Sequence, residues 1–272
     1  MKDSSPALLG LGARERARYA TLLRSAGATI TVAQAAEIWQ LPAHKTAMAL
    51  SVLAKKGWLK RIHYGVYIPV PVEQRSLNFL PEEPFAIAEG LFAPCYITGR
   101  NAANYWGMTD QIFRTVTVMT AKQVKNRTPT ISGVEYDIHT IKSEYFFGLR
   151  TLWVGATKVQ IADPSRTLID MMMFPQFCGG TTFIVEVLED YLRSKHKNIA
   201  VLLDYLKQAE NGAAVKRLGF LVEKFFKQEE EILAYCAQHL TQGYVKLMPQ
   251  RECQKLVSRW RVWVPNRWKE SS

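Results

Sequence analysis

Cysteine is scarce in this sequence. The 272 residues include four cysteines, Cys95, Cys178, Cys236 and Cys253, and no two of them form a CxxC pair. Cysteines this far apart match neither a disulfide framework nor the usual spacing of a zinc site. We therefore expect free, buried thiols in a reducing compartment.

Long apolar runs are missing as well. No apolar stretch reaches about 18 residues, the length that a membrane-spanning helix needs. The N-terminus has no apolar h-region of the kind that a signal peptide carries. The sequence therefore predicts a cytoplasmic protein with no membrane segment and no signal peptide.

Recognisable catalytic motifs are also absent. The pair Gly179-Gly180 is not followed by the lysine and serine of a phosphate-binding Walker loop. Glu135 and Asp137 lie on a probable strand, but the lysine of a nuclease site does not accompany them. The histidines are scattered, and no metal-ligand spacing relates the other acidic candidates, Asp163, Asp170, Glu186, Glu189 and Asp190. We expect no enzyme activity, no metal and no cofactor.

Acidic residues are few at the N-terminal end. The chain has 35 Lys/Arg and 24 Asp/Glu, a net charge of +11. Residues 1–75 hold eleven Lys/Arg and four Asp/Glu, a net charge of +7, whereas residues 76–272 hold 24 and 20, a net of +4. Such a basic segment favours binding to nucleic acid, because phosphate contacts release condensed counterions.

The stretch Thr29–Ile68 predicts two helices and a hairpin. Thr31 and Gln34 have the spacing of a capping box at the start of the first helix. Pro42 suits the first turn of a second helix that ends before Gly57. Strand-forming residues follow, with a turn near residues 63–65. This order is typical of a winged helix-turn-helix domain.

Spacing along the second helix separates two faces. Ala43, Thr46, Ala47, Leu50, Leu53 and Ala54 fall on one side and predict packing against another helix. On the other side we expect His44, Lys45, Met48 and Ser51 to approach DNA bases. We expect phosphate or minor-groove contacts from Thr31, Lys55, Lys56, Lys60, Arg61, His63 and Tyr64. The alternatives are a helical domain with a solvated basic face and a winged helix used only for protein contact.

The remaining chain predicts a second domain. The prolines between Val72 and Pro84 indicate a linker, so we divide the chain into residues 1–75 and 76–272. Alternating strands and helices predict a mixed α/β core at about 84–180, and helical periodicity predicts an extension with a final strand at about 181–269. The expected fold class is α+β.

Several polar residues of this second domain are candidates for function. Arg100, Asn101 and Asn104 either face a ligand or RNA, or serve as caps and turn residues. Asp163, Ser165 and Arg166 are placed to cap and stabilise a helix entrance. Arg217 either pairs with Glu223 or makes a functional contact. The Trp/Arg tail, residues 250–269, either stacks on nucleic acid or forms a core strand.

Five segments resemble one known family. They are KKGWLKRIHYGVYIP (55–69), YITGRNAANYWG (96–107), IADPSRTLIDMM (161–172), VKRLGFLVE (215–223) and RWRVWVPN (259–266). In this order they resemble the AbiE-type antitoxins of type IV toxin–antitoxin systems, which act in abortive phage infection. The third and fourth segments are the more specific ones.

The resemblance implies a fold and an activity. An N-terminal winged helix-turn-helix domain would bind inverted repeats in its own promoter and act as a repressor. A C-terminal domain, holding Arg100, Asn101, Asn104, Asp163, Arg166 and Arg217, would counteract a nucleotidyltransferase-like toxin without a stable complex. We expect a monomer in solution that binds DNA cooperatively. The alternatives are a stand-alone winged-helix regulator and an enzyme acting on nucleic acid or on the toxin.

Overall fold

The computed structural model describes residues 10–25, 27, 29–70, 84–155 and 157–265. Helices and strands are both abundant, so the α+β class is confirmed. Apart from Pro84, the predicted linker lies outside the described residues. None of the described helices is long and apolar enough to span a bilayer. The chain forms two compact units: Met1–Tyr96, Arg114–Thr140 and Thr151–Gln160 make the first, and Ile97–Phe113, Ile141–Arg150 and Ile161–Ser272 make the second.

The first unit begins with three helices and a small sheet. The helices are α1 (Ala13–Ser25), α2 (Val32–Trp39) and α3 (Ala43–Lys55). The strands are β1 (Ile30–Thr31), β2 (Leu59–His63) and β3 (Val66–Pro69), in the order β1-β3-β2 with antiparallel pairing. The two predicted helices and the hairpin are therefore confirmed as elements.

Local sequence signals set the ends of α2 and α3. The Thr31 hydroxyl accepts the Gln34 N–H at 3.1 Å, and Gln34 Oε1 accepts the Thr31 N–H at 2.9 Å, so the capping box is confirmed. Pro42 precedes α3 directly, and Gly57 follows it with a φ of 83°. The chain thus makes a tight turn between two short helices.

One apolar cluster holds these elements together. Tyr19 and Trp58 meet edge to face, with ring centroids 5.3 Å apart. The buried members come from all three helices and all three strands: Tyr19, Leu22, Ile30, Ala35, Leu50, Leu53, Leu59 and Tyr67. This core buries the side of α3 that carries Thr46, Leu50 and Leu53, and it leaves the other side exposed to solvent.

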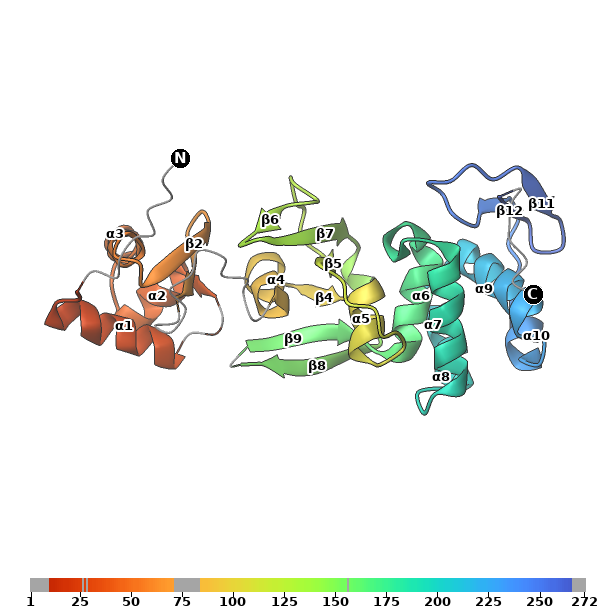
Figure 1. The fold of residues 1–272 in the computed structure, drawn as a ribbon, viewed down its shortest axis with the longest axis horizontal. Coiled ribbons are helices and arrows are strands. Elements are labelled where there is room, and N and C mark those ends of the chain that lie inside the picture. Colours follow the sequence, from red (N-terminus) through yellow and green to blue (C-terminus); the bar gives the residue numbers. More distant parts are fainter. Residues whose placement is uncertain (1–9, 26, 28, 71–83, 156, 266–272) are drawn as a thin grey trace. The chain divides into compact units, whose positions relative to one another are not determined.

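A six-stranded mixed sheet follows in the chain (Figure 1). Its strands are β4 (Cys95–Ile97), β5 (Thr115–Thr120), β6 (Thr130–Ile131), β7 (Val134–Thr140), β8 (Leu149–Val154) and β9 (Thr157–Ala162). Their order is β6-β7-β5-β4-β9-β8, with β5 parallel to β7 and β4 parallel to β9. Helix α4 (Pro84–Phe92) contacts β5, and the Tyr136 hydroxyl donates to the Pro84 carbonyl at 2.9 Å.

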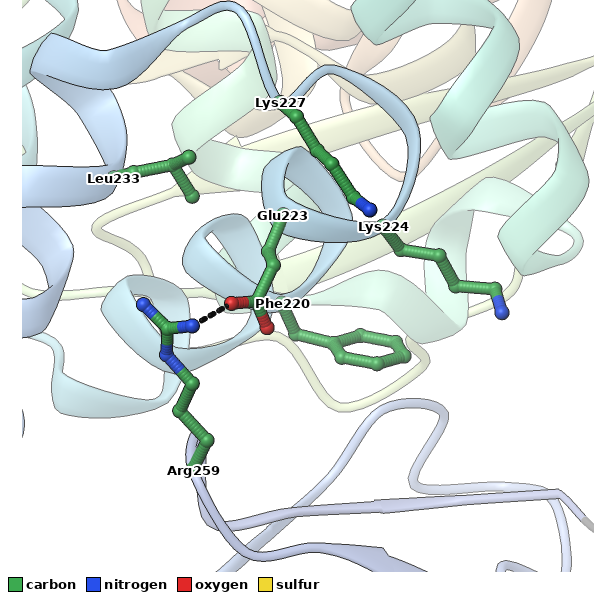
Figure 2. Close-up of a pocket in the computed structure, with 6 residues that line it drawn as sticks. All are labelled: Phe220, Glu223, Lys224, Lys227, Leu233 and Arg259. Carbon is green, nitrogen blue, oxygen red and sulfur yellow. Dashed lines mark ion pairs between the residues drawn. The ribbon is translucent and has the colours of Figure 1, made fainter.

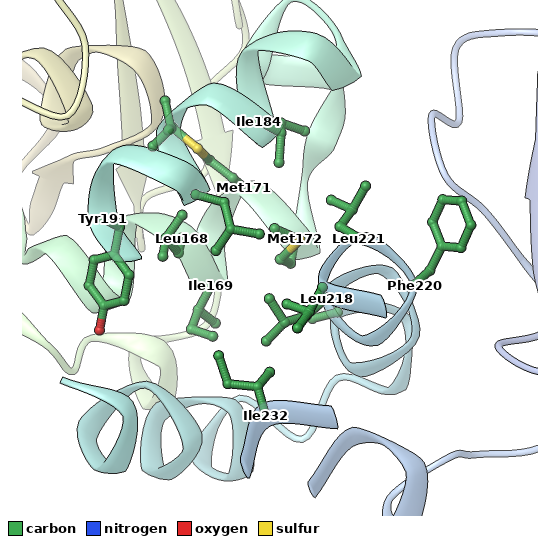
Figure 3. Packing of buried hydrophobic residues seen from close by; sticks show 14 of the residues in the cluster. Leu168, Ile169, Met171, Met172, Ile184, Tyr191, Leu218, Phe220, Leu221 and Ile232 are labelled. Carbon is green, nitrogen blue, oxygen red and sulfur yellow. The ribbon is translucent and has the colours of Figure 1, made fainter. Parts of the chain in front are cut away.

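Helices dominate the second unit. They are α5 (Gly99–Tyr105), α6 (Pro164–Met173), α7 (Thr181–Arg193), α8 (Ile199–Gln208), α9 (Gly212–Phe225) and α10 (Glu230–Gln238), with 3-10 turns at Ser143–Tyr145 and Pro175–Cys178. Helix α6 contacts α5, α7, α8 and α9, and every residue from Ser165 to Met172 is buried. In Figure 3, Leu168 and Met172 of α6 gather with Leu218 and Leu221 of α9.

A three-stranded sheet lies near the C-terminal end. Its strands are β10 (Val245–Lys246), β11 (Lys255–Val257) and β12 (Val262–Val264), in the order β10-β12-β11. The predicted final strand is therefore confirmed. Trp260 is 0% exposed, so this tryptophan belongs to the core and is not available for stacking on nucleic acid.

The contact between α9 and Trp260 gives a stability prediction. A Cβ added at Gly219 would overlap the six-membered ring of Trp260. Gly→Ala in a helix usually stabilises by up to about 1 kcal/mol. Here we expect Gly219→Ala to lower the free energy of urea unfolding by about 1–3 kcal/mol through overpacking. In a Trp260→Leu background the loss should shrink or change sign; an equal loss in both backgrounds would contradict the proposed clash.

Candidate functional site

The outward side of α3 is exposed and mostly polar, with Met48 and the 41% exposed Val52 as its apolar residues. Met48 is 68% exposed, and its neighbours on this side are exposed or, for Ser51, half-buried. The inward side consists of the fully or nearly buried Thr46, Leu50 and Leu53. Ala43 was predicted on the packed side but is exposed, because it is the first residue of the helix. The structure thus brings together the candidates His44, Lys45, Met48, Ser51 and Lys55.

The β2–β3 hairpin presents a second group of candidates. Arg61, His63 and Tyr64 are exposed, Tyr64 by 85%, and Lys60 is half-buried. The Arg61 guanidinium lies 5.1 Å from the ring centroid of Tyr64, and its Nε donates to the His63 carbonyl at 3.3 Å. These contacts hold a cation and an aromatic ring together at the tip of the hairpin.

We name these two groups together the basic face: His44, Lys45, Met48, Ser51, Lys55, Lys60, Arg61, His63 and Tyr64. Between Ala43 and Pro69 the sequence has five Lys/Arg and no Asp/Glu. Helix α3 has no acidic residue in its first turn, and no side chain caps its first turn. The N–H groups of that turn carry partial positive charge, so they add to the attraction for an anion.

Two of the residues predicted to contact DNA have partners within the protein. Lys56 Nζ pairs with Glu15 at 2.6 Å, and the lysine side chain is only 26% exposed. This hydrogen bond, together with the Gly12 N–H, lowers the pKa of Glu15. Lys56 therefore links α1 to the end of α3, and the Thr31 hydroxyl caps α2. We remove both residues from the proposed contact set, since their polar atoms already have partners.

Asp163 and Arg166 lie at the buried start of α6. Asp163 is confirmed as the cap, because its Oδ1 accepts the Arg166 N–H at 2.8 Å. Its Oδ2 accepts the Tyr205 hydroxyl at 2.9 Å, and burial together with this bond raises the pKa of Tyr205 to about 12. Ser165 was also a predicted cap, but its hydroxyl is hydrogen-bonded to Tyr191 Oη at 2.8 Å.

The Arg166 side chain is fully buried beside Asp170. Its Nε donates to Asp170 Oδ1 at 2.9 Å, and its guanidinium lies 4.1 Å from the Phe147 ring centroid. Thr98 donates its hydroxyl proton to Asp170 Oδ2 at 2.6 Å. Two opposite charges four residues apart on a helix are a local signal for this pair. Thr98 carries no such signal, because it lies far from α6 in the sequence.

Arg217 does not pair with Glu223, so the first of its two alternatives is wrong. Its guanidinium donates instead to the carbonyls of Met172 at 2.7 Å and Lys246 at 3.0 Å. Burial lowers the pKa of Arg217 to about 10, which still leaves it charged near pH 7. Carbonyl groups at the end of α6 satisfy this buried charge, as expected for cations near a helix C-terminus.

Glu223 instead lines a surface hollow of about 580 Å³. Figure 2 shows its carboxylate paired with Arg259, beside Phe220 and Lys224. The same carboxylate accepts the indole N–H of Trp260 at 2.5 Å. Glu223 therefore joins the segment before β12 to α9, with one carboxylate oxygen paired to Arg259 and the other bonded to Trp260.

The candidates on α5 divide into two kinds. Asn101 is 7% exposed, and Asn104 donates to the carbonyls of Thr109 and Gln111, which holds the loop after the helix. The turn-forming alternative therefore explains Asn104. Arg100 differs, because it lines a cavity of about 700 Å³ together with Arg251, which the sequence did not single out. Within the described ranges, no three His, Cys, Asp or Glu side chains gather as metal ligands.

Comparison with known proteins gives a fold and no function. No family model and no curated protein matches this chain. The crystal structure of the RV2827C protein from Mycobacterium tuberculosis is similar, with a TM-score of 0.63 and 15% sequence identity. The match covers 95% of this chain and 94% of that one. At this identity the likeness shows a shared fold over nearly the whole chain.

The buried pair on α6 gives the second prediction. Asp170→Ala should lower the free energy of urea unfolding by about 3–5 kcal/mol, because it leaves the charge of Arg166 buried without its carboxylate. The double variant Arg166→Met/Asp170→Leu should lose less, since it removes both charges and keeps most of the volume. Equal losses in the single and double variants would show that packing, not charge, sets the stability here.

Proposed function

We propose that this protein is a DNA-binding transcriptional repressor, in which α2 and α3 form a helix-turn-helix and the β2–β3 hairpin forms a wing. The observation that supports this most strongly is the basic face. One exposed surface of α3 and one hairpin tip carry cations with no acidic residue between Ala43 and Pro69. A membrane or an acidic protein would also attract cations, but a narrow helix face beside a basic hairpin fits a duplex groove and its phosphates.

Side-chain size supports α3 as the reading helix. The major groove of B-DNA is about 12 Å wide and admits one helix. The side chains that this helix points outward must reach the base edges. His44, Lys45 and Ser51 supply hydrogen-bonding groups, and Met48 supplies an exposed apolar group for contact with a thymine methyl. The opposite side is buried in the core of the same domain. Packing of its buried side therefore holds the helix in one orientation, which favours a defined register on DNA.

The hairpin supplies contacts that do not depend on sequence. Lys60 and Arg61 lie on β2, and His63 and Tyr64 follow at its end. Lysine and arginine bind phosphate through charge-assisted hydrogen bonds, and each neutralised phosphate steepens the dependence of affinity on salt. We therefore assign base contacts to α3 and phosphate contacts to the hairpin and Lys55.

The resemblance to AbiE-type antitoxins supports a second part of this proposal. In that reading the protein represses its own promoter at inverted repeats and binds them cooperatively as a monomer. Its C-terminal region counteracts a nucleotidyltransferase-like toxin in the cytoplasm. A stand-alone winged-helix regulator is the alternative, and it would bind DNA without protecting against a toxin.

A salt series tests the DNA-binding assignment. We expect Lys60→Ala/Arg61→Ala to weaken binding to every duplex and to reduce the slope of log K against log salt by up to about 2 units. Fluorescence anisotropy with the upstream promoter fragment and with a scrambled duplex measures the affinity and the salt slope. Lys207→Ala, an exposed lysine on α8, is the matched control and should change neither value. An unchanged slope in the hairpin variant would remove the hairpin from the phosphate contacts.

Growth rescue tests whether repression and toxin neutralisation are separate. The full chain is expressed from an unrelated promoter, beside a cognate nucleotidyltransferase-like toxin. Lys45→Ala/Lys60→Ala/Arg61→Ala should abolish promoter binding yet keep the rescue, because the proposed antitoxin region lies after residue 75. Loss of rescue by a folded variant would tie neutralisation to DNA binding. Absence of rescue by the unmodified chain would favour the stand-alone regulator.

A further inference from the structure

A cavity at the start of α7 has the composition of an anion site. It encloses about 700 Å³ and is lined by residues from separate parts of the second unit. We call it the α7 pocket and define its polar wall by Arg100 from α5, Gly179, Gly180, Thr181 and Arg251. None of the DNA-binding residues belongs to it.

The guanidinium groups of Arg100 and Arg251 lie beside two consecutive glycines, Gly179 and Gly180. A Cβ built on Gly179 would lie 3.8 Å from Arg100 Nη1, and a Cβ on Gly180 would lie 3.7 Å from Arg251 Nη2. Because consecutive Cα atoms are about 3.8 Å apart, both cations lie against the same short turn. Gly179 has a φ of 76°, in the left-handed region that favours glycine, and it leaves the backbone accessible to a ligand.

This turn leads directly into a helix of thirteen residues. Helix α7 begins after Gly180 with no side-chain cap and no acidic residue in its first turn. The first N–H groups of a helix have no acceptor within it, and they carry the positive end of the helix dipole. An oxyanion at this point would accept these N–H groups and both guanidinium groups.

The charged groups around the pocket leave a net positive site. In the part of the chain that the structure describes, neither Arg100 nor Arg251 makes an ion pair, and Arg100 Nε is buried with no hydrogen-bond partner. Burial raises the pKa of the adjacent Cys178, so it stays a neutral thiol. Glu186 is the one carboxylate among the lining residues, and it is exposed on α7. Two cations therefore face one anion.

The pocket also has an aromatic lining. Phe113, Phe183 and Phe225 line it, and the rings of Phe113 and Phe183 meet edge to face with centroids 5.5 Å apart. The Arg100 guanidinium lies over Phe113, with Cζ 4.9 Å from the ring centroid, so a cation–π contact joins the cation to the aromatic lining. The volume lies within the range of about 300–1,000 Å³ that holds small organic ligands, more than a phosphate ion fills.

We propose that the α7 pocket binds a phosphate monoester, with the phosphate between Arg100, Arg251 and the start of α7 and the organic part against the three phenylalanines. Phosphate is favoured over a carboxylate because its three terminal oxygens can accept from two guanidinium groups and from backbone N–H groups at the same time. An aromatic organic part, such as a nucleoside, fits the phenylalanine wall better than a bare sugar.

Isothermal titration calorimetry on the full chain tests this site. The probes are inorganic phosphate, ribose 5-phosphate, AMP and adenosine. We expect AMP to bind, adenosine to bind at least about tenfold more weakly, and Arg251→Gln to lose at least about tenfold in AMP affinity. Arg251 is exposed, so this variant keeps the core intact; Arg100→Gln serves as a second variant, checked for folding by circular dichroism.

Two controls separate this pocket from the basic face. Lys207→Gln should leave AMP binding unchanged, and so should Lys60→Ala/Arg61→Ala, because neither touches the pocket. Equal binding of phosphate and AMP would assign the site to free phosphate, still held by the same cations. Absence of binding by all three phosphorylated probes, or full AMP affinity in folded Arg251→Gln and Arg100→Gln, would overturn the proposal.

Discussion

The second unit depends on a charge pair that has no access to water. Arg166 and Asp170 have side chains that are 0% and 1% exposed. Removing two such ions from water costs several kcal/mol each, so the pair is tolerable only where further hydrogen bonds and close contacts offset that cost. The Thr98 hydroxyl donates to Asp170, and the Arg166 guanidinium lies over the Phe147 ring. Thr98 and Phe147 come from segments far apart in the chain, so the need to satisfy one buried pair fixes the positions of several elements around α6.

Other polar side chains of this unit also form hydrogen bonds that position helices around α6. Tyr205 of α8 reaches Asp163, Tyr191 of α7 reaches Ser165, and Arg217 of α9 reaches the carbonyls that end α6. Each helix that surrounds α6 is thus attached to it by a hydrogen bond as well as by apolar packing. Apolar packing alone tolerates rotation and sliding of helices, whereas directed bonds select one register.

The two more specific segments that resemble AbiE-type antitoxins lie in this framework around α6. IADPSRTLIDMM covers the end of β9, the Asp163 cap and α6 as far as Met172, and VKRLGFLVE lies within α9 and is buried as far as Val222. The closing segment contains Trp260, which packs against Gly219. A resemblance in these residues is therefore informative about the fold. Function has to be argued from the exposed groups, the basic face and the α7 pocket.

Sequence reasoning succeeded where the determining contacts were local. The capping box of Thr31, the start of α3 after Pro42 and the Asp163 cap depend on residues within four positions of each other. It failed where two residues far apart in the sequence meet. Lys56 looked like a phosphate ligand because Glu15 lies 41 residues earlier, and Arg217 looked like a partner of Glu223 because Lys246 and Met172 are distant in the chain.

The α7 pocket was hidden for the same reason. Gly179-Gly180 lacks the following lysine of a phosphate loop, so no linear motif is present. The structure supplies the cations from elsewhere, through Arg100 and Arg251. The two proposed sites also differ in their response to salt. Charges on the exposed basic face are screened over about 8 Å at physiological ionic strength, whereas Arg100, whose Nε is buried in the pocket, is screened less. Raising salt should therefore release DNA well before it weakens a phosphate held at the start of α7.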